Sequence, residues 1–265
     1  MIDTILTNLP ENFPWKNCIL YFDTIDSTNT KAKQLASQGA PHGTVLIADS
    51  QTGGRGRLGR SFHSPPGSGI YLSVILRPQC HAGQLMHLTC ATGVAMCDAV
   101  EAACGTRPCI KWTNDLVFGK RKLGGILTEL SLDTTGNTAY AVVGIGINCT
   151  QMESDFPEDI CSIATSLQAQ TGDSIDRSRV IAAMLVSLEE MSRKLLHQKV
   201  QIMDQYRTDC ITVGQEISVV AGDQIRHGTA ISVDDEGALV VHFSDGHTEA
   251  VNSGEVSVRG MYGYI

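Results

Sequence analysis

Residues 52–69 read TGGRGRLGRSFHSPPGSG, and this stretch decides between two kinds of fold. Three of its glycines have the G-x-G-x-x-G spacing of a dinucleotide-binding loop. Such a loop needs a strand before it, a helix opening from it, and an acidic residue about 20 positions later. Pro65 and Pro66 exclude the helix, and residues 75–80 contain no acid. The stretch therefore does not predict a doubly wound dinucleotide-binding fold.

The same loop contains three arginines, Arg55, Arg57 and Arg60. Guanidinium groups present fixed donors that suit carboxylates and phosphates, and glycines such as Gly54 and Gly56 allow backbone amides to approach an anion closely. The three like charges repel one another when no anion is present. We therefore expect an anion-binding loop that becomes ordered when its ligand binds. A solvated basic loop without a ligand is the alternative.

Two further segments carry residue types that suit a nucleotide. Residues 111–115 read KWTND, and residues 120–125 read KRKLGG. An indole offers a packing surface, an amide can bind a base or sugar, and a carboxylate can contact Mg²⁺ or a ribose hydroxyl. The alternatives are that Trp112 is a core aromatic residue and that the basic run is a solvated turn.

The chain up to about residue 210 has the pattern of a mixed α/β unit. Short apolar runs predict strands at residues 18–23, 44–48, 70–76, 109–112, 116–118, 125–130 and 139–148. The turn sequence TTGN between the last two runs predicts an antiparallel hairpin. Helices are expected at residues 29–37, 84–104 and 162–170, and from Arg177 to beyond residue 195, with cap residues at Asp26 or Ser27 and at Asp176.

The last part of the chain has a different texture. From Thr212 onward, five short β segments are separated by tight turns, which predicts a small SH3-like barrel. We therefore expect a first domain of residues 1–211 and a second of residues 212–265. The second contains two basic residues and eight acidic residues, which argues against RNA binding.

Composition narrows the functional class. The 265 residues have a net charge of −8, so general binding to nucleic acid or to anionic membranes is not expected. The N-terminus has no signal-peptide pattern, and no run is long and apolar enough for a membrane span, so we expect a cytoplasmic protein. The nine cysteines include no C-x-x-C pair, which indicates neither a disulfide framework nor a zinc ribbon.

Five motifs, in this order and with these separations, resemble those of the biotin protein ligases. They are DSTN (26–29), QTGGRGRLGR (51–60), KWTND (111–115), RKLGGIL (121–127) and GIGIN (144–148). The resemblance extends from about residue 20 to the C-terminus, and the small β domain corresponds to the C-terminal SH3-like domain of that family. It implies an α+β fold, with a mixed β-sheet catalytic domain flanked by helices.

The resemblance also implies a two-step reaction. The biotin carboxylate attacks the α-phosphate of MgATP, which gives biotinyl-5′-AMP and pyrophosphate. A specific lysine of a biotin carboxyl carrier protein domain, part of a carboxylase such as acetyl-CoA carboxylase, then receives the biotin as an amide. The cofactor set is therefore biotin, ATP and Mg²⁺, with biotin as substrate.

By matched position, the resemblance assigns roles to individual residues. The catalytic residues are Arg55, Arg57 and Lys122. The biotin site comprises Ser27, Thr28, Asn29, Gln51, Gly54, Arg55, Gly56, Arg57, Lys122, Gly124 and Gly125. The ATP site comprises Arg57, Arg60, Lys111, Trp112, Asn114, Asp115 and Asn148, with Asp115 as a candidate Mg²⁺ contact.

The sequence also departs from the family and leaves alternatives open. Thr113 replaces a usual proline and Phe62 a usual tryptophan, which puts the aim of Asn114 and the affinity in question. Fewer than 20 residues precede the first expected strand, so we do not expect an N-terminal DNA-binding domain. A homodimer through edge strands is known in the family, but the sequence identifies no exposed edge. A lipoate-type ligase and a non-catalytic biotin- or nucleotide-binding module are the alternative functions.

Overall fold

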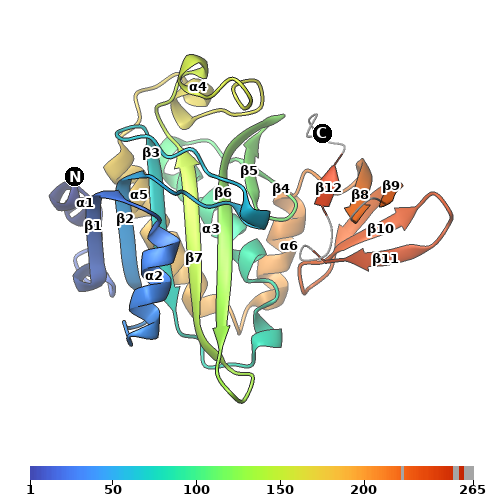
Figure 1. The fold of residues 1–265 in the computed structure, drawn as a ribbon, viewed down its shortest axis with the longest axis horizontal. Helices are drawn as coiled ribbons and strands as arrows, with labels where there is room; N and C mark the ends of the chain where they lie inside the picture. The colour runs from blue at the N-terminus through green and yellow to red at the C-terminus, as the bar shows by residue number, and fades with distance from the viewer. Residues whose placement is uncertain (222–223, 253–256, 260–265) are drawn as a thin grey trace.

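The structure is a computed structural model that describes residues 1–221, 224–252 and 257–259. A seven-stranded mixed sheet forms its centre, with helices on both faces and a five-stranded sheet at one side (Figure 1). The strand order in the large sheet is β1-β2-β3-β7-β6-β5-β4. Its strands are β1 (Ile19–Ile25), β2 (Thr44–Gln51), β3 (Gly69–Leu76), β4 (Cys109–Lys111), β5 (Asp115–Phe118), β6 (Arg121–Leu132) and β7 (Thr138–Asn148).

Neighbouring strands of the large sheet are antiparallel except for β1 and β2, which are parallel. The predicted hairpin is confirmed, because β6 and β7 pair over most of their length. Its turn is closed by Asp133, whose carboxylate accepts hydrogen bonds from the backbone amides of Thr135 and Asn137. Gly136 adopts φ +82°, a conformation that favours glycine. The strand β6 begins at Arg121, so Lys122 lies on a strand and not in the turn that the sequence suggested.

The central strands β2, β3 and β7 are mostly buried on both faces, which explains their continuous apolar runs. On strand β2, Val45 and Ile47 pack into the core beneath the long helices, whereas Leu46 packs into a smaller core beneath α2 (Thr28–Ser37). Successive side chains of a strand point to opposite faces, so one run feeds both cores. Helices α3 (Leu88–Cys104), α5 (Arg177–Lys194) and α6 (Lys199–Asp209) cover the face opposite α2 (Figure 1).

The helix caps are confirmed, but three helix boundaries differ from the prediction. Ser27 caps α2 and Asp176 caps α5. Instead of one helix from residue 84, a separate turn η3 (Ala82–Leu85) is closed by a capping box, and α3 begins at Leu88. The short helix α4 (Leu167–Thr171) starts later than expected, because the preceding backbone pairs with β6.

The fourth predicted helix does not continue beyond residue 195. The helix α5 ends at Lys194, and the carbonyl of Leu195 contacts the buried His87 side chain at 2.9 Å. A second helix, α6, then leads to the C-terminal domain. A short N-terminal helix, α1 (Ile2–Asn8), and the turns η1 (Lys16–Cys18), η2 (Arg57–Gly59) and η4 (Glu153–Asp155) complete the set. Within the described ranges, no helix is long and apolar enough to cross a lipid bilayer.

The C-terminal domain is an antiparallel sheet in the order β11-β10-β9-β8-β12, as the five predicted segments indicated. Its strands are β8 (Glu216–Ala221), β9 (Gln224–Val233), β10 (Leu239–Phe243), β11 (Thr248–Val251) and β12 (Ser257–Arg259). It packs beside α6, which contacts β9 (Figure 1). Trp112 joins the two parts, because its backbone amide donates to Thr212 Oγ1 and its indole Nε1 donates to the carbonyl of Gly237, both at 2.9 Å.

Candidate active site

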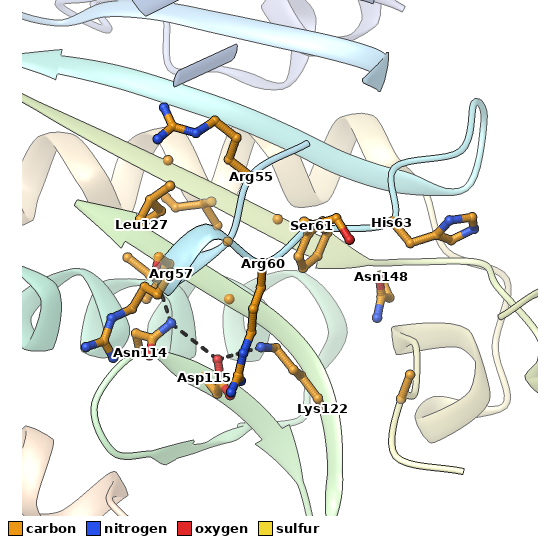
Figure 2. Close-up of a pocket in the computed structure, with 18 of the residues that line it drawn as sticks. Arg55, Arg57, Arg60, Ser61, His63, Asn114, Asp115, Lys122, Leu127 and Asn148 are labelled. Carbon is orange, nitrogen blue, oxygen red and sulfur yellow. Dashed lines mark hydrogen bonds and ion pairs between the residues drawn. The ribbon is translucent and has the colours of Figure 1, made fainter. Parts of the chain in front are cut away.

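A pocket of about 290 Å³ lies where the arginine-rich loop crosses the large sheet (Figure 2). Segments that are far apart in the sequence meet there: the start of α2, the loop after β2, the β4–β5 turn, the start of β6 and the end of β7. Among the described residues that line the pocket, Asp115 is the one carboxylate. Five arginine or lysine residues also line it: Arg55, Arg57, Arg60, Lys111 and Lys122. The pocket is therefore suited to an anionic ligand.

The arginine-rich loop, residues 52–62, folds as a narrow hairpin. The amide of Gly56 donates to the carbonyl of Arg60 at 2.7 Å, and the amide of Phe62 donates to the carbonyl of Gly54 at 2.9 Å. A Cβ atom at Gly54 would lie 2.4 Å from the Phe62 carbonyl oxygen, so glycine permits this closure. At the tip, Leu58 has φ +56° and is 68% exposed. Hydrogen bonding thus gives the loop a defined shape, with an exposed tip.

One chain of polar contacts connects the loop to two strands. Arg57 NH1 donates to Asn114 Oδ1 at 2.8 Å, and Asn114 Nδ2 contacts Asp115 Oδ1 at 3.3 Å. The same carboxylate oxygen lies 2.7 Å from Lys122 Nζ. Figure 2 shows these side chains gathered at one end of the pocket, with the dashed lines running through Asp115. Residues from the arginine-rich loop, from segment 111–115 and from segment 120–125 therefore form one group.

Burial shifts the pKa values of two cations that line this part of the pocket. Burial lowers the pKa of Lys111, which is 7% exposed; Asp115 opposes the shift, and Lys122 and Arg60 add to it. Burial also lowers the pKa of Arg57, again against the influence of Asp115. Cations held out of water and near one another are stabilised by an added anion. A phosphate or carboxylate in the pocket would supply that charge.

A second group, in which Glu129 pairs with Lys33 at 2.7 Å and with Arg55 at 3.5 Å, forms another part of the wall. Gln51 Oε1 accepts from the Thr28 amide at 2.9 Å and lies 3.1 Å from Thr28 Oγ1. Asn29 Nδ2 donates to the carbonyl of Leu127 and to Glu129 Oε2. Burial would raise the pKa of Glu129, but hydrogen bonds from Lys33 and Asn29 lower it overall, so it remains a carboxylate. These polar groups are held in place before any ligand binds.

Glycines of β7 make room for this wall and for the loop. A Cβ at Gly144 would lie 1.9 Å from Asn29 Oδ1, and one at Gly146 would lie 2.5 Å from the Phe62 ring. Phe62, which stands where a tryptophan is usual, therefore packs its ring over β7. The GIGIN motif is thus explained by close approach of side chains from α2 and from the loop.

An apolar wall of the same pocket was not predicted from the sequence. It comprises Phe156, Ile160, Ile163 and Ala164, from the segment between β7 and α4. The segment is fastened to β6, because the Lys122 amide donates to the Ile163 carbonyl at 2.6 Å and the Thr165 amide donates to the Lys122 carbonyl at 2.8 Å. The only signal in the sequence is a few apolar residues in a loop, which does not distinguish this wall from ordinary packing.

The structure brings nearly all of the predicted site residues into one pocket. The predicted residues that line it are Ser27, Thr28, Asn29, Gln51, Arg55, Gly56, Arg57, Arg60, Lys111, Trp112, Asn114, Asp115, Lys122, Gly125 and Asn148. Gly54 and Gly124 do not line it. Gly54 closes the loop, and Gly124 allows β6 to approach β7, where a Cβ would lie 2.3 Å from the Gly146 carbonyl oxygen. Trp112 lines the pocket but is also buried against the C-terminal domain, so the core-aromatic interpretation holds in part.

The departure at Thr113 is compensated by buried contacts. Tyr206 OH donates to the Thr113 carbonyl at 3.1 Å, and the Thr113 hydroxyl lies 3.8 Å from Cys90 Sγ. Asn114 Nδ2 donates to the carbonyl of Ile126 at 3.0 Å, and the amide of Ile126 donates back to the Asn114 carbonyl. The turn that aims Asn114 and Asp115 is therefore held on both sides without a proline. No cluster of three or more metal-binding side chains occurs in the part of the chain that the structure describes.

Comparison with known proteins identifies relatives along most of the chain. Residues 21–148 match the biotin/lipoate A/B protein ligase family, and residues 212–259 match the biotin protein ligase C-terminal domain. A bifunctional ligase/repressor BirA from Bacillus spizizenii is 37% identical over 86% of this chain and 70% of that protein. A biotin–(acetyl-CoA-carboxylase) ligase from Mycobacterium tuberculosis is 34% identical over 87% of this chain and 85% of that protein. The biotin protein ligase from Aquifex aeolicus, solved in complex with biotin and ATP, superimposes with a TM-score of 0.76 at 31% identity and covers 91% of this chain and 98% of that one.

Proposed function

The chain belongs to the biotin/lipoate A/B protein ligase family, as a biotin protein ligase, and from this premise we propose that it joins biotin to a lysine of a carrier domain through an adenylate. The acceptor that we propose is the biotin carboxyl carrier domain of an acetyl-CoA carboxylase. The relative from Mycobacterium tuberculosis bears the name of that reaction, and the Aquifex aeolicus structure contains both small substrates.

The observation that carries the proposal is the pairing of two chemically different groups in one pocket. Thr28, Asn29 and Gln51 form a wall of uncharged polar side chains, which suits the ureido ring of biotin. The group around Arg57 and Lys122 is cationic, as a carboxylate and a triphosphate require. An acid with a polar ring would therefore bind with its ring at the first group and its carboxylate at the second.

In the first step, a biotin carboxylate oxygen attacks the α-phosphorus of ATP, and the bond from this phosphorus to the bridging oxygen of the β-phosphate breaks. Two anions must approach each other, and charge develops on the α-phosphoryl oxygens, so fixed cations supply the main catalytic effect. We assign this role to Arg55, Arg57 and Lys122. The ion pair of Lys122 with Asp115 holds its ammonium group at the cationic end of the pocket before the substrates arrive.

In the second step, the neutral amine of the carrier lysine attacks the acyl carbon of biotinyl-5′-AMP. The bond between the acyl carbon and the phosphate oxygen breaks, AMP leaves, and the nitrogen loses a proton to give an amide. The adenylate must stay bound and shielded from water until the carrier arrives, because water would hydrolyse it. The apolar wall of Phe156, Ile160 and Ile163 lines the same pocket, and we propose that it packs against the nucleoside and limits water there.

Magnesium is proposed to enter with the nucleotide. Mg²⁺ in nucleotide sites is typically held by one or two carboxylates together with phosphate oxygens and water. The lining supplies Asp115, whose carboxylate is already ion-paired with Lys122, and the amide oxygen of Asn148. These groups fit an ion whose other ligands are phosphate oxygens and water, so the ion is written as part of the MgATP substrate.

The test is to mix the chain with biotin, ATP, Mg²⁺ and a purified carrier domain, and to look for biotin on the carrier by mass spectrometry. A carrier with its acceptor lysine changed to arginine is the matched control. Pyrophosphate release without the carrier reports the first step alone. Arg57→Ala should reduce both readouts, whereas Arg193→Ala should reduce neither, because Arg193 pairs with Glu189 on the exposed side of α5.

Each outcome separates one alternative. Pyrophosphate release with lipoate but not with biotin would replace the biotin assignment with a lipoate-type ligase. Binding of biotin without pyrophosphate release would indicate a non-catalytic binding module. Pyrophosphate release without transfer to the acetyl-CoA carboxylase domain would retain the adenylation step and reject the proposed acceptor.

A further inference from the structure

Ser73 is a polar residue in a part of the sheet where burial is complete. It lies in the middle of β3, a strand whose eight residues are all buried, and its own exposure is 0%. A hydroxyl in such a place costs free energy unless it is hydrogen-bonded. Ser73 is not among the residues that line the pocket, so direct contact with a ligand does not explain it.

Both hydrogen-bond partners of Ser73 are residues of the pocket wall. Its Oγ atom lies 2.6 Å from Asn29 Oδ1 and 2.8 Å from Thr28 Oγ1. Thr28 and Asn29 are both buried, and both line the pocket. Ser73 therefore stands directly behind the wall that we assign to the polar ring of biotin.

The proton of Ser73 has a defined destination. Asn29 Nδ2 faces two acceptors, the Leu127 carbonyl oxygen at 3.2 Å and Glu129 Oε2 at 3.0 Å, which fixes the orientation of the amide. Asn29 Oδ1 is then an acceptor, and at 2.6 Å it requires a proton from Ser73. The same hydroxyl contacts Thr28 Oγ1 at 2.8 Å.

The proton of Thr28 is consequently directed away from the pocket. The Gln51 amide is oriented by its contacts with the Thr28 amide and with Ser64 Oγ, so Gln51 Oε1 is also an acceptor. Thr28 Oγ1 donates to Gln51 Oε1 at 3.1 Å and lies 2.8 Å from the Ser73 hydroxyl, which is a donor to it. The Thr28 proton is therefore used inside the wall, and only a lone pair remains for a ligand.

We infer that Ser73 is a positioning residue: by holding Asn29 and Thr28 in place it keeps this wall in its acceptor arrangement, and it thereby favours acids whose ring carries an N–H group. This inference rests on the proposed function, in which biotin presents its ureido N–H at the wall. A dithiolane ring, as in lipoate, has no N–H group and gains nothing from the arrangement. Ser73 thus contributes to the choice between the two acids without touching either.

The test is Ser73→Ala, which removes the hydroxyl and leaves Asn29 Oδ1 without this donor. The dissociation constant for biotin should rise about tenfold, equivalent to about 1.4 kcal/mol at 25 °C. Desthiobiotin, which keeps the ureido group, should weaken equally. The affinities for lipoate and octanoate, and the KM for ATP, should change by less than about twofold, because they do not use the acceptor. Ser73→Thr keeps the hydroxyl and should restore most of the biotin affinity.

The controls separate positioning from general loss of stability. Thr92→Val removes another fully buried hydroxyl, which bonds only one turn back in its helix to the Leu88 carbonyl, and it should leave the ratio of biotin to lipoate affinity unchanged. Equal weakening of biotin and lipoate in Ser73→Ala, or unchanged biotin affinity, would overturn the role of Ser73 while leaving the proposed function intact. Failure of the unaltered chain to bind biotin would overturn both.

Discussion

Gly144→Ala tests whether the polar wall depends on a missing side chain in β7. A Cβ at Gly144 would lie 1.9 Å from Asn29 Oδ1 and 2.6 Å from Asn29 Cγ. Carbon and oxygen atoms in contact are normally about 3.3 Å apart, so the amide must retreat by more than about 1 Å. Gly144 is paired on both sides, with Ser73 of β3 and Leu127 of β6, so the backbone is not free to yield instead.

The cost follows from the bonds that this retreat breaks. Asn29 loses its 2.6 Å contact with Ser73, and its donation to Leu127 and Glu129 is strained. A buried acceptor left unpaired costs about 1–3 kcal/mol, and overpacking costs about 1–3 kcal/mol more. Together these predict about 2–6 kcal/mol of lost stability, or a fall in unfolding temperature of roughly 4–24 °C. Biotin affinity should fall at least about tenfold, because the displaced amide occupies the binding wall.

Differential scanning fluorimetry and isothermal titration calorimetry with biotin measure these two effects. Gly83→Ala is the matched control, because Gly83 does not line the pocket and its Cβ would lie 3.5 Å from the His81 Nδ1 atom, an ordinary contact, so both values should stay close to those of the unaltered chain. The reasoning is refuted if Gly144→Ala unfolds within about 2 °C of the unaltered chain and binds biotin within about twofold.

Three other variants and one hydrogen-exchange measurement give separate checks. Lys111→Met should raise the KM for ATP but also raise the unfolding temperature at pH 7. Because burial lowers the pKa of Lys111 in the folded state, this gain in unfolding temperature should shrink as pH rises from the lowered pKa towards 10.5. A constant or absent gain in a thermal-shift series would contradict this. Arg57→Ala should slow adenylate formation or speed adenylate release by about 100-fold with little change in fold, and unchanged pyrophosphate kinetics would count against its assigned role. Trp112→Phe removes the indole bond to Gly237 of the C-terminal domain and should lower the unfolding temperature and weaken ATP binding, whereas a normal KM for ATP would show that this contact does not support the site. Hydrogen exchange across residues 52–62 should slow when biotin or the adenylate binds, and equal protection in both states would exclude an ordering loop.

Much of the fold was predictable because its signals are local. The prolines after the arginine-rich loop excluded a helix at that position, and Ser27 and Asp176 marked two helix starts that the structure confirms. Failures came where a contact from elsewhere set a boundary. The helix predicted beyond residue 195 ends at Lys194, where the buried His87 takes the next carbonyl, and α4 starts late because its leading segment pairs with Lys122.

The site shows the same division. Motif spacing marked the residues with chemistry, such as Arg57, Asn114 and Lys122, because charged and amide side chains near glycines are visible in the sequence. The apolar wall at Phe156 and the role of the Ser73 hydroxyl could not be predicted from the sequence, because an apolar loop residue and a serine in a strand have no distinctive local pattern. Gly54 illustrates the opposite case, since its place in a motif suggested ligand contact but the structure uses it to close the loop.

The sequence by itself determined the order of the strands, two of the helix caps, the character of the arginine-rich loop, and the five motifs that resemble the family. Only the tertiary structure decided which of these residues meet. Ser73 contacts Asn29 because β3 pairs with β7 in a register that leaves Gly144 without a side chain between α2 and the sheet. Such contacts depend on sheet register and strand order, which are set by the packing of the whole core and not by any local pattern.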